Sequence, residues 1–512
     1  MSAIPHGSGT TTDETETFGR RSDRASRRLH GVALAGIVAL ALLLRALFLG
    51  QEGFWYDEGE SVQLAGTDGL ASLVARLWHE HEPNMSLYHA LLNIWMSLGS
   101  TESVVRALSV LFAVITIPLV YLLGDRLFGR RTGLLAALLL ALNLYHIDYS
   151  REARSYALLV LLTVLASLFF VSAIRRSTWS GWALYTVTIV LAIYSHFFAA
   201  FVAGAHGLSF ALLRQRNFPW RHVAMSTCLA GVLLIPLGIF VLATKNFAGH
   251  LAGIPRPGAD AVPRLLSYLA TGAPVATTRV GGRLDVAAAV ARRVLLFLYA
   301  GWVGVALATA GQLRSRQSKS FETWAYGFLL LWLLVPPIVA YLVSFIIPIF
   351  FDRYLIVSLA PLILLAANGL SRIRPMAMST IALIALVSLV ALQATAYYHF
   401  PRKEDWRGAV EYIASQARPG DTVVVYTGSP YNSTVAVFEY YRNRYRPKAS
   451  GMLRVLPLVD VLREKPPRVW LVVAHIDTSR AATAESQLAF QRVAVDSQRF
   501  FGDIQVLLYQ AK

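Results

Sequence analysis

Residues 31–50 have the sequence GVALAGIVALALLLRALFLG and are followed at once by QEGFWYDEGE, residues 51–60. The first stretch is apolar over a length that crosses about 30 Å of hydrocarbon as a helix. The second places two neighbouring carboxylates, Asp57 and Glu58, a few residues beyond the end of that span. Charged groups at this depth are costly unless they bind a ligand or take part in a reaction. The two stretches therefore predict a membrane protein with a site at one membrane face.

The composition of the whole chain is typical of a protein that crosses the membrane many times. Of its 512 residues, 55% are hydrophobic and 15% are charged, and the mean hydropathy is +0.51. Soluble domains have about 25% charged residues. The apolar stretches predict about eleven transmembrane helices, of which the third and sixth are short. They lie at residues 31–50, 103–123, 132–145, 155–174, 182–198, 199–213, 223–243, 289–311, 324–347, 354–370 and 377–397.

Basic residues distinguish the two sides of the membrane. The net charge is +17, but its arginines gather in alternate loops, which argues against nucleic acid as a partner. These residues are Arg20, Arg21, Arg24, Arg27, Arg28, Arg126, Arg130, Arg131, Arg175, Arg176, Arg214, Arg216, Arg221, Arg314, Arg316, Lys319, Arg372 and Arg374. Loops rich in Lys and Arg face the cytoplasm. The pattern predicts a cytoplasmic N-terminus and, after an odd number of spans, a C-terminus on the outer side.

The chain divides into three parts by composition. Residues 1–19 are rich in Thr, Ser and Gly, and we expect a disordered cytoplasmic N-terminus over residues 1–29. A transmembrane domain is predicted over residues 30–398, and it contains the only cysteine, Cys228. For residues 399–512 we predict a small extracytoplasmic α/β domain without a disulfide. Its predicted helices are residues 405–416 and 434–442, and its predicted strands are residues 421–426, 469–475 and 504–509.

Three clusters of polar residues fall at the outer ends of the predicted spans. Two long outer loops cover residues 51–102 and 244–288, and residues 70–78 of the first have the spacing of a helix lying in the membrane interface. Unrelated structural ion pairs would have no reason to gather at one face. The clusters are Asp57, Glu58, His79, Glu80, His81, Glu82 and Tyr88, then His146, Asp148, Tyr149, Arg151, Glu152, Arg154 and Tyr156, and finally Asp352, Arg353 and Tyr354.

Carboxylates and arginines together at the lipid boundary are suited to one kind of reaction. A carboxylate takes the proton from an attacking hydroxyl or amine. Arginine binds phosphate oxygens with paired hydrogen bonds and stabilises the charge on a phosphate leaving group. The phosphate of a lipid lies at this depth. The pattern therefore indicates transfer of a group from a polyprenyl phosphate to an acceptor outside the cytoplasm.

Four stretches, in this order, resemble the bacterial membrane glycosyltransferases of the GT-C class. They are the pair Asp57 and Glu58, HEPNMSLY at residues 81–88, YSREARSY at residues 149–156, and DRYL at residues 352–355. The closest group is family 39-like and is related to the protein O-mannosyltransferases and to the aminoarabinose transferase of lipid A. The resemblance covers roughly residues 30–370, and a soluble outer tail is usual in this class. It implies a polytopic α-helical GT-C fold in the bacterial inner membrane.

The resemblance also implies roles for individual residues. Asp57, with Glu58 beside it, corresponds to the proposed general base of an inverting transfer from a polyprenyl-phosphate sugar to an envelope acceptor. Relatives of the aminoarabinose type have a lysine before the proline of the first loop, where this chain has Glu82, so its phosphate clamp must differ. No cofactor is implied, although His81 leaves a divalent metal ion open. The expected substrate-binding and lipid-phosphate-binding residues are His81, Tyr88, Asp148, Arg151, Glu152, Arg154, Arg353 and Tyr354.

Other interpretations stay open on the sequence. A transporter or flippase of lipid-linked sugars would show repeated halves, and none is visible. An oligosaccharide ligase would differ from the transferase in its donor, and a non-catalytic envelope assembly protein would act by binding a partner with its outer domain. Structural roles are the alternative for Arg151, Glu152, Arg154 and Arg353, and they are favoured for Arg45 and Arg106.

Overall fold

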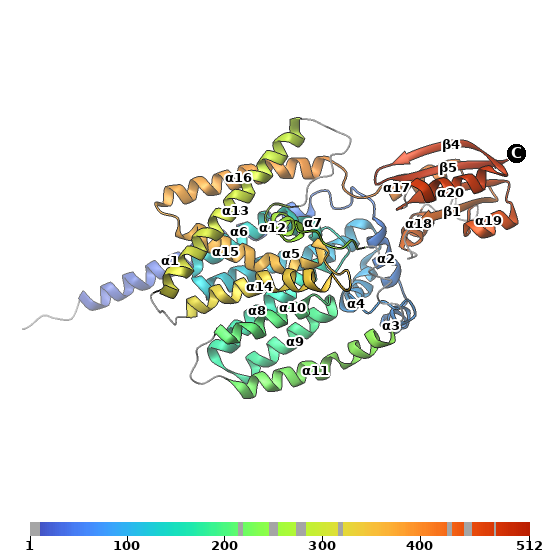
Figure 1. Cartoon of the computed structure of the whole chain (residues 1–512). Coiled ribbons are helices and arrows are strands. Elements are labelled where there is room, and N and C mark those ends of the chain that lie inside the picture. Colours follow the sequence, from blue (N-terminus) through green and yellow to red (C-terminus); the bar gives the residue numbers. More distant parts are fainter. Residues whose placement is uncertain are drawn as a thin grey trace, which may run out of the picture.

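The computed structural model describes residues 11–212, 219–244, 254–272, 283–315, 321–427, 433–444, 453–475 and 478–512. These residues form a helical bundle with a small domain of mixed helices and strands at one end (Figure 1). The predicted fold class, a polytopic helical protein with a C-terminal α/β domain, is confirmed. Four of the basic residues used for the topology, Arg214, Arg216, Arg316 and Lys319, lie outside the described residues.

Helices cover every predicted span. Eight helical segments of the described chain are long and apolar enough to cross a membrane. They are formed by α1 (Thr11–Ala46), α5 (Glu102–Phe128), α8 (Tyr156–Arg176), α11 (Trp220–Ala243), α13 (Arg283–Ser315), α14 (Phe321–Val343), the 3-10 helix η4 (Asp352–Ser358) continued by α15 (Leu359–Arg372), and α16 (Met376–His399). The short predicted spans also correspond to helices, as described next, so the number of complete crossings is eight or nine by length.

The third predicted span is bent. It consists of α6 (Arg130–Leu142) and α7 (Leu144–Ser150), which meet at an angle of 59°. The residue between them, Asn143, accepts a hydrogen bond from the main-chain N–H of His146 at 2.9 Å and so caps α7. Two further predicted spans, α9 (Trp179–Ser195) and α10 (Ala199–Ser209), are shorter apolar helices. The bend at Asn143 brings the polar cluster of residues 146–156 to the end of the bundle that contacts the α/β domain.

The N-terminal segment differs from the expectation for residues 1–29. Helix α1 begins at Thr11, although disorder was expected as far as residue 29. Residues 11–46 contain no proline. Once the apolar span has nucleated a helix, each added turn extends it at little cost. The apolar composition of residues 30–46 therefore sets the position of the span but not the start of the helix.

Two helices form the centre of the bundle and others surround them. Helix α8 and the segment formed by η4 and α15 are the most buried spans, whereas α1, α11, α13 and α16 expose apolar side chains. Such outer surfaces are typical of helices that face lipid. At Gly369 on α15, a Cβ atom would lie 1.7 Å from the carbonyl oxygen of Trp302 on α13. Glycine at this position therefore permits the close contact between the two helices.

The first outer loop is largely helical. It contains α2 (Tyr56–Ala65), α3 (Leu70–His79) and α4 (Ser86–Trp95), followed by the short 3-10 helix η1 (Met96–Leu98). The predicted interfacial helix at residues 70–78 is confirmed as a helix, α3. The structure adds α2 and α4, and also α12 (Ala261–Thr271) in the second long loop. Helix α2 carries the early carboxylate pair into the same end of the bundle as the polar cluster of residues 146–156.

The C-terminal domain is built on a five-stranded sheet in the order β2-β1-β3-β5-β4. Strand β1 pairs in parallel with both β2 and β3, and β5 pairs antiparallel with both β3 and β4. The predicted helices and strands are present as α17 (Trp406–Gln416), β1 (Asp421–Thr427), α18 (Ser433–Arg444), β3 (Arg468–Ala474) and β5 (Ile504–Ala511). Four elements were not predicted: β2 (Leu453–Val455), α19 (Leu458–Glu464), α20 (Thr478–Ala489) and β4 (Arg492–Phe500).

Polar contacts fix this domain to the end of the bundle at which α2 lies. Glu102, in the first turn of α5, accepts hydrogen bonds from Arg407 at 2.8 Å, Arg444 at 2.6 Å and the Tyr441 hydroxyl at 3.0 Å. The same hydroxyl accepts a hydrogen bond from the main-chain N–H of Phe54 at 2.6 Å. The α/β domain therefore lies directly against the segment that leads into α2.

Candidate active site

The two neighbouring carboxylates lie in the first turn of α2. The positive end of the helix dipole favours acidic side chains there. Both are buried, Asp57 with 5% and Glu58 with 0% of its surface exposed. Consecutive side chains on a helix point about 100° apart. Asp57 and Glu58 therefore enter different surroundings, although they are adjacent in sequence.

Glu58 is held by groups from three other parts of the chain. Its two carboxylate oxygens accept hydrogen bonds from Arg106 on α5 at 2.8 and 2.6 Å. Lys403, from the segment between α16 and α17, lies 3.0 Å from Oε2, and the main-chain N–H of Ala153 donates to Oε1 at 2.9 Å. Burial alone would raise the pKa of Glu58, but Arg106, Lys403 and these hydrogen bonds lower it to about 2. Glu58 is therefore a fixed anion that joins α2 to its neighbours.

Asp57 faces two arginines. Its Oδ2 lies 2.7 Å from Nη1 of Arg353, at the start of η4. Arg154, just before α8, donates from Nη1 to the main-chain oxygen of Asp57 and to the hydroxyl of Ser61, both at 3.2 Å. One Arg154 nitrogen also lies 3.4 Å from the carboxylate of Glu60. Residues of the first, second and third polar clusters therefore meet around Asp57.

Both arginines keep donors unused. The Nε atoms of Arg154 and Arg353 are buried and have no hydrogen-bond partner in the described part of the chain. Arg353 packs against aromatic rings, with its guanidinium 5.4 Å from the centre of the Trp55 ring and 4.5 Å from that of Phe351. Buried donors without partners are rare because each costs about 1–3 kcal/mol. Arg45, Arg407, Arg442 and Arg492 have buried Nε atoms without a partner among the described residues as well, so it is the position of Arg154 and Arg353 beside Asp57 that makes their donors available to an anionic ligand.

Glu152 adds a second carboxylate near this site. It is buried, and its Oε2 has no hydrogen-bond partner among the described residues. Burial and the charges of Asp148 and Glu58 outweigh the opposing charge of Lys403 and raise its pKa to about 7. The protonated and the ionised form of Glu152 are therefore both populated near neutral pH.

Arg151 and Asp148 hold the scaffold together. Arg151 donates to the main-chain oxygens of residues 45, 47 and 48 at the outer end of α1, and its guanidinium lies 5.1 Å from the Tyr398 ring. Asp148 pairs with Arg402 at 2.8 Å and accepts a hydrogen bond from the Tyr397 hydroxyl at 3.1 Å. The guanidinium of Arg151 is thus already engaged by main-chain carbonyls.

The remaining predicted residues lie at different distances from the centre. Tyr354 follows Arg353, and its ring packs 4.9 Å from His196 and 6.4 Å from Tyr156. Tyr88 is buried on α4 and its hydroxyl lies 3.1 Å from that of Ser109, which donates to the main-chain oxygen of Arg154. His81, after α3, has a left-handed backbone with φ of 57°. Its side chain makes no hydrogen bond or ion pair in the described part of the chain that would join it to Asp57.

Three residues of this network were not predicted as site residues. Lys403 reaches Glu58 from a segment far along the chain, and no local pattern marks it. Glu60 lies beside Arg154 with 27% of its side chain exposed, and partial burial together with the carboxylates of Glu82 and Asp57 raises its pKa against the effect of Arg154. Its position three residues after Asp57 on the same helical face could have signalled it. Arg106 was expected to be structural, and its ion pair with Glu58 agrees with this.

No group of three or more His, Cys, Asp or Glu side chains suited to a metal ion occurs in the described ranges. His81, which left a metal ion open on the sequence, therefore belongs to no such group in the part of the chain that the structure describes. The arrangement that the described residues do form is one of carboxylates and arginines. Such a set favours proton transfer and anion binding.

Comparisons with known proteins concern the fold of the chain and not the individual residues of this site. Residues 82–240 match the family described as dolichyl-phosphate-mannose-protein mannosyltransferase. No curated protein matches the chain in sequence. The matched segment includes the second polar cluster but neither Asp57 nor Arg353.

Solved structures match over nearly the whole chain. ArnT from Cupriavidus metallidurans in the apo state is 12% identical, with a TM-score of 0.59 over 93% of this chain and 97% of that one. The same protein bound to undecaprenyl phosphate gives a TM-score of 0.56 at 11% identity over the same shares. The oligosaccharyltransferase AglB from Archaeoglobus fulgidus, in complex with an inhibitory peptide and a dolichol-phosphate, gives 0.56 at 13% identity over 95% and 74%. The predicted GT-C fold is therefore confirmed.

Proposed function

We propose that this chain is a membrane glycosyltransferase of the bacterial inner membrane. It transfers a glycosyl group from a polyprenyl-phosphate-linked sugar to an extracytoplasmic acceptor, which is a protein, a lipid or a cell-envelope glycan. The observation that supports this best is the pair of buried guanidinium groups beside Asp57 whose Nε donors have no partner in the described chain. Undecaprenyl phosphate is bound in one similar structure and dolichol phosphate in another. A lipid phosphate would satisfy these donors.

In this mechanism Asp57 is the general base. The acceptor hydroxyl or amine donates a hydrogen bond to the Asp57 carboxylate and loses its proton to it as it attacks the anomeric carbon. The bond between that carbon and the phosphate oxygen breaks, and its electrons pass to the departing polyprenyl phosphate. Arg154 and Arg353 stabilise the added negative charge. A single displacement of this kind inverts the configuration at the anomeric carbon.

Of the three arginines expected to bind the phosphate, the proposal keeps two, Arg154 and Arg353. Arg151 was also expected to bind the phosphate, but its donors are used by the main chain at the end of α1. The charge of Arg353 acts on the Glu152 carboxyl group, which when protonated would donate a hydrogen bond to a phosphate oxygen. For His81, Tyr88 and Tyr354 we propose contact with the donor away from the reacting atoms.

An oligosaccharide ligase is the nearest alternative, since it differs in the donor and not in the required base. A flippase of lipid-linked sugars is less well supported, because the buried charges lie at one end of the bundle and not at mid-membrane. The proposed topology has the N-terminus in the cytoplasm and the α/β domain outside. Its basis is the alternation of basic loops.

The proposal is tested with purified protein in lipid and a panel of radiolabelled polyprenyl-monophosphate sugars. Asp57→Asn is expected to lower turnover by roughly 10² to 10⁴, the usual contribution of a positioned base. Asp68→Asn, which changes an exposed carboxylate in the same loop, is the matched control and should retain turnover. Normal turnover by a folded Asp57→Asn protein would remove Asp57 as the base. Binding of the lipid without turnover of any donor would favour the flippase or the ligase.

A further inference from the structure

His196, the residue after α9, is a buried histidine with an unused hydrogen-bond donor. Only 1% of its surface is exposed. Its Nδ1 accepts a hydrogen bond from the main-chain N–H of Phe198 at 3.3 Å. A neutral imidazole that accepts at one nitrogen carries its proton on the other, so the His196 proton lies on Nε2. That nitrogen has no hydrogen-bond partner within the described residues.

A second buried histidine of the bundle shows how a structural role is met. Nε2 of His206, on α10, lies 3.0 Å from the Ser167 hydroxyl, and its Nδ1 lies 3.2 Å from the Tyr185 hydroxyl. Both ring nitrogens of His206 are therefore satisfied by the protein itself. At His196 one ring nitrogen is satisfied in this way and the other is not.

The position of His196 distinguishes it from other histidines. His89 and His146 also have ring nitrogens without a partner in the described ranges, so an unused nitrogen does not by itself mark a ligand site. The ring centre of His196 lies 4.9 Å from that of Tyr354, which follows Arg353 in the sequence. His196 also lies within electrostatic range of Arg353. Its unused donor therefore lies beside a residue that binds the phosphate in the proposed reaction.

The hydroxyl of Tyr156 shares these surroundings. Tyr156 is the first residue of α8, none of its surface is exposed, and its hydroxyl has no hydrogen-bond partner in the part of the chain that the structure describes. Its ring centre lies 6.2 Å from that of His196 and 6.4 Å from that of Tyr354. Tyr156 is also within electrostatic range of Arg353 and Asp57. Two uncharged polar groups without partners therefore lie close to the proposed base.

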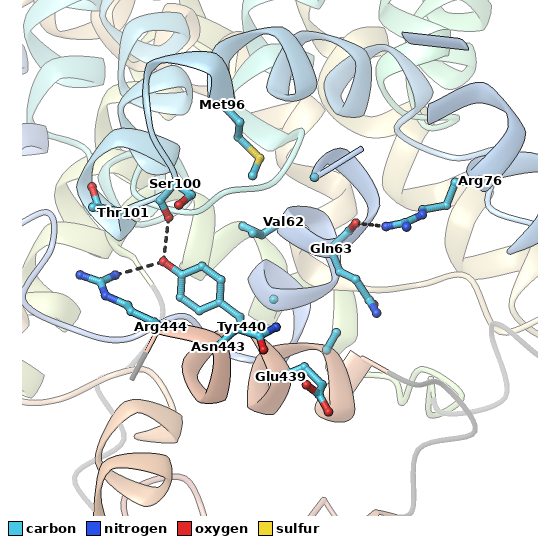
Figure 2. Close-up of a pocket in the computed structure, with 13 residues that line it drawn as sticks. Val62, Gln63, Arg76, Met96, Ser100, Thr101, Glu439, Tyr440, Asn443 and Arg444 are labelled. Carbon is cyan, nitrogen blue, oxygen red and sulfur yellow. Dashed lines mark hydrogen bonds between the residues drawn. The ribbon is translucent and has the colours of Figure 1, made fainter. Parts of the chain in front are cut away.

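A pocket elsewhere in the protein differs in this respect. It has a volume of about 620 Å³ and lies between α2 and α18 (Figure 2). The amides and hydroxyls that line it, those of Gln63, Ser100, Thr101 and Asn443, belong to exposed residues. Water satisfies exposed polar groups, whereas a buried one without a partner costs about 1–3 kcal/mol. Tyr156 and His196 therefore indicate a ligand more strongly than this pocket does.

The chemistry of the two side chains fits a sugar. Both are uncharged, whereas a phosphate is held best by charged donors such as the neighbouring arginines. The Tyr156 hydroxyl both donates and accepts hydrogen bonds, as the hydroxyl groups of a sugar do, and His196 Nε2 donates. Aromatic walls with a few placed polar groups are typical of ligand sites. Tyr354, between the two rings and Arg353, adds such a wall.

We propose that His196 and Tyr156 bind the sugar of the polyprenyl-phosphate donor. His196 Nε2–H donates to one sugar hydroxyl and the Tyr156 hydroxyl bonds to another, while Arg154 and Arg353 hold the phosphate. This rests on the glycosyl transfer proposed above and assigns sugar recognition to two residues outside the reacting groups. A site that hydrogen-bonds substrate hydroxyls discriminates against sugars that lack them, because its buried groups are then left unpaired.

The test measures binding of undecaprenyl phosphate and of undecaprenyl-phosphate mannose, glucose, galactose and arabinose to the full chain in lipid nanodiscs, without an acceptor. At least one of the four glycosides should bind more tightly than undecaprenyl phosphate. Tyr156→Phe and His196→Ala should each weaken binding of that glycoside about three- to tenfold, the loss of one neutral hydrogen bond. Binding of undecaprenyl phosphate should not change. His196→Gln, whose amide N–H can replace Nε2–H, should recover part of the loss.

Two controls separate sugar binding from a structural role. Tyr194→Phe also removes a tyrosine hydroxyl, one that donates to the main-chain oxygen of Leu233 at an exposed position, and it should leave glycoside binding unchanged. Thermal unfolding without donor is the second control. Tyr156→Phe removes a buried hydroxyl without a partner, so the variant should be at least as stable as the wild type. A clear loss of stability would show that this hydroxyl serves the fold and would overturn its assignment.

The binding data distinguish this proposal from the transferase itself. Turnover of a donor, with glycoside binding unchanged in both variants, would overturn the sugar site and leave the transferase in place. Equal weakening of undecaprenyl phosphate and the glycosides would place the two residues at the phosphate and overturn the sugar site. The same conclusion would follow if no glycoside bound more tightly than undecaprenyl phosphate. Selective weakening of a glycoside that the wild type binds but does not turn over would uphold the sugar site and remove the transferase.

Discussion

Replacing Glu58 with Gln should destabilise the protein, whereas replacing its neighbour Asp57 should chiefly lower turnover. The Glu58 carboxylate receives two hydrogen bonds from Arg106, one from the Ala153 main chain and an ion pair from Lys403, with none of its surface exposed. A glutamine side chain has the same shape but no charge. Its amide would point two hydrogens towards groups that are themselves donors. Arg106 would then be a buried cation without its anion.

Two arguments give the expected loss of stability in Glu58→Gln. A pKa of about 2 in place of 4.5 corresponds to ~3 kcal/mol in favour of the ionised form of Glu58 in the folded state. Breaking a buried ion pair by removing one partner costs about 3–5 kcal/mol. Because the pKa is lowered by folding, this stability is complete above pH 4.5 and is lost as the pH falls towards 2.

The assay is thermal unfolding of the wild type and Glu58→Gln from pH 8 to pH 4, with donor turnover measured on the same samples. The gap in stability should be constant above about pH 5 and begin to narrow at pH 4. Glu80→Gln, at an exposed glutamate of the same loop, should unfold as the wild type does. A Glu58→Gln protein with wild-type unfolding and turnover lowered 10²-fold would refute this reasoning and make Glu58 a chemical participant.

Three further changes test the rest of the site. Arg353→Ala should lower turnover of a polyprenyl-phosphate sugar by about 10² to 10³, by analogy with the loss of one oxyanion donor; unchanged kinetics would place the clamp elsewhere. Lys403→Met should lower the free energy of unfolding by about 1.5–3 kcal/mol, the contribution of one charge-assisted hydrogen bond. Lys403→Arg should recover part of this loss. Equal unfolding of the wild type and both variants would show that the contact with Glu58 does not stabilise the protein. Glu152 has a raised pKa of about 7, so the folded state holds a proton that the unfolded chain loses above pH 4.5, and stability falls as the pH rises through that range. Glu152→Gln should remove this fall, and identical pH profiles of unfolding would contradict the buried position of the carboxyl group.

The features that could be predicted from the sequence are those that depend on the composition of a single segment. Each apolar run became a helix, and the second and third polar clusters met Asp57 because all lie at the outer ends of spans. Helix α2 was not predicted, because it is short, nearly neutral in hydrophobicity and held mainly by partners distant in sequence. Contact with α18 is one of them, since a Cβ on Gly59 would lie 2.5 Å from Val437. Lys403 was missed for the same reason, since only the folded chain brings it to Glu58.

The two adjacent carboxylates therefore have different roles. Asp57 is the proposed general base, and Glu58 fixes the position of the helix that carries it. A general base must be oriented to within a fraction of an ångström, and side chains locked by neighbours provide such orientation. Glu58 supplies it, because its fixed anion ties α2 to α5 through Arg106 and to the segment before α8 through Ala153. The segment held by Ala153 continues into Arg154, which donates to the Asp57 main chain. Lys403 extends the same network to the segment that leads into the α/β domain. If the outer domain shifted, Glu58 would lose one of its cations, and the position of Asp57 relative to the arginines would change with it.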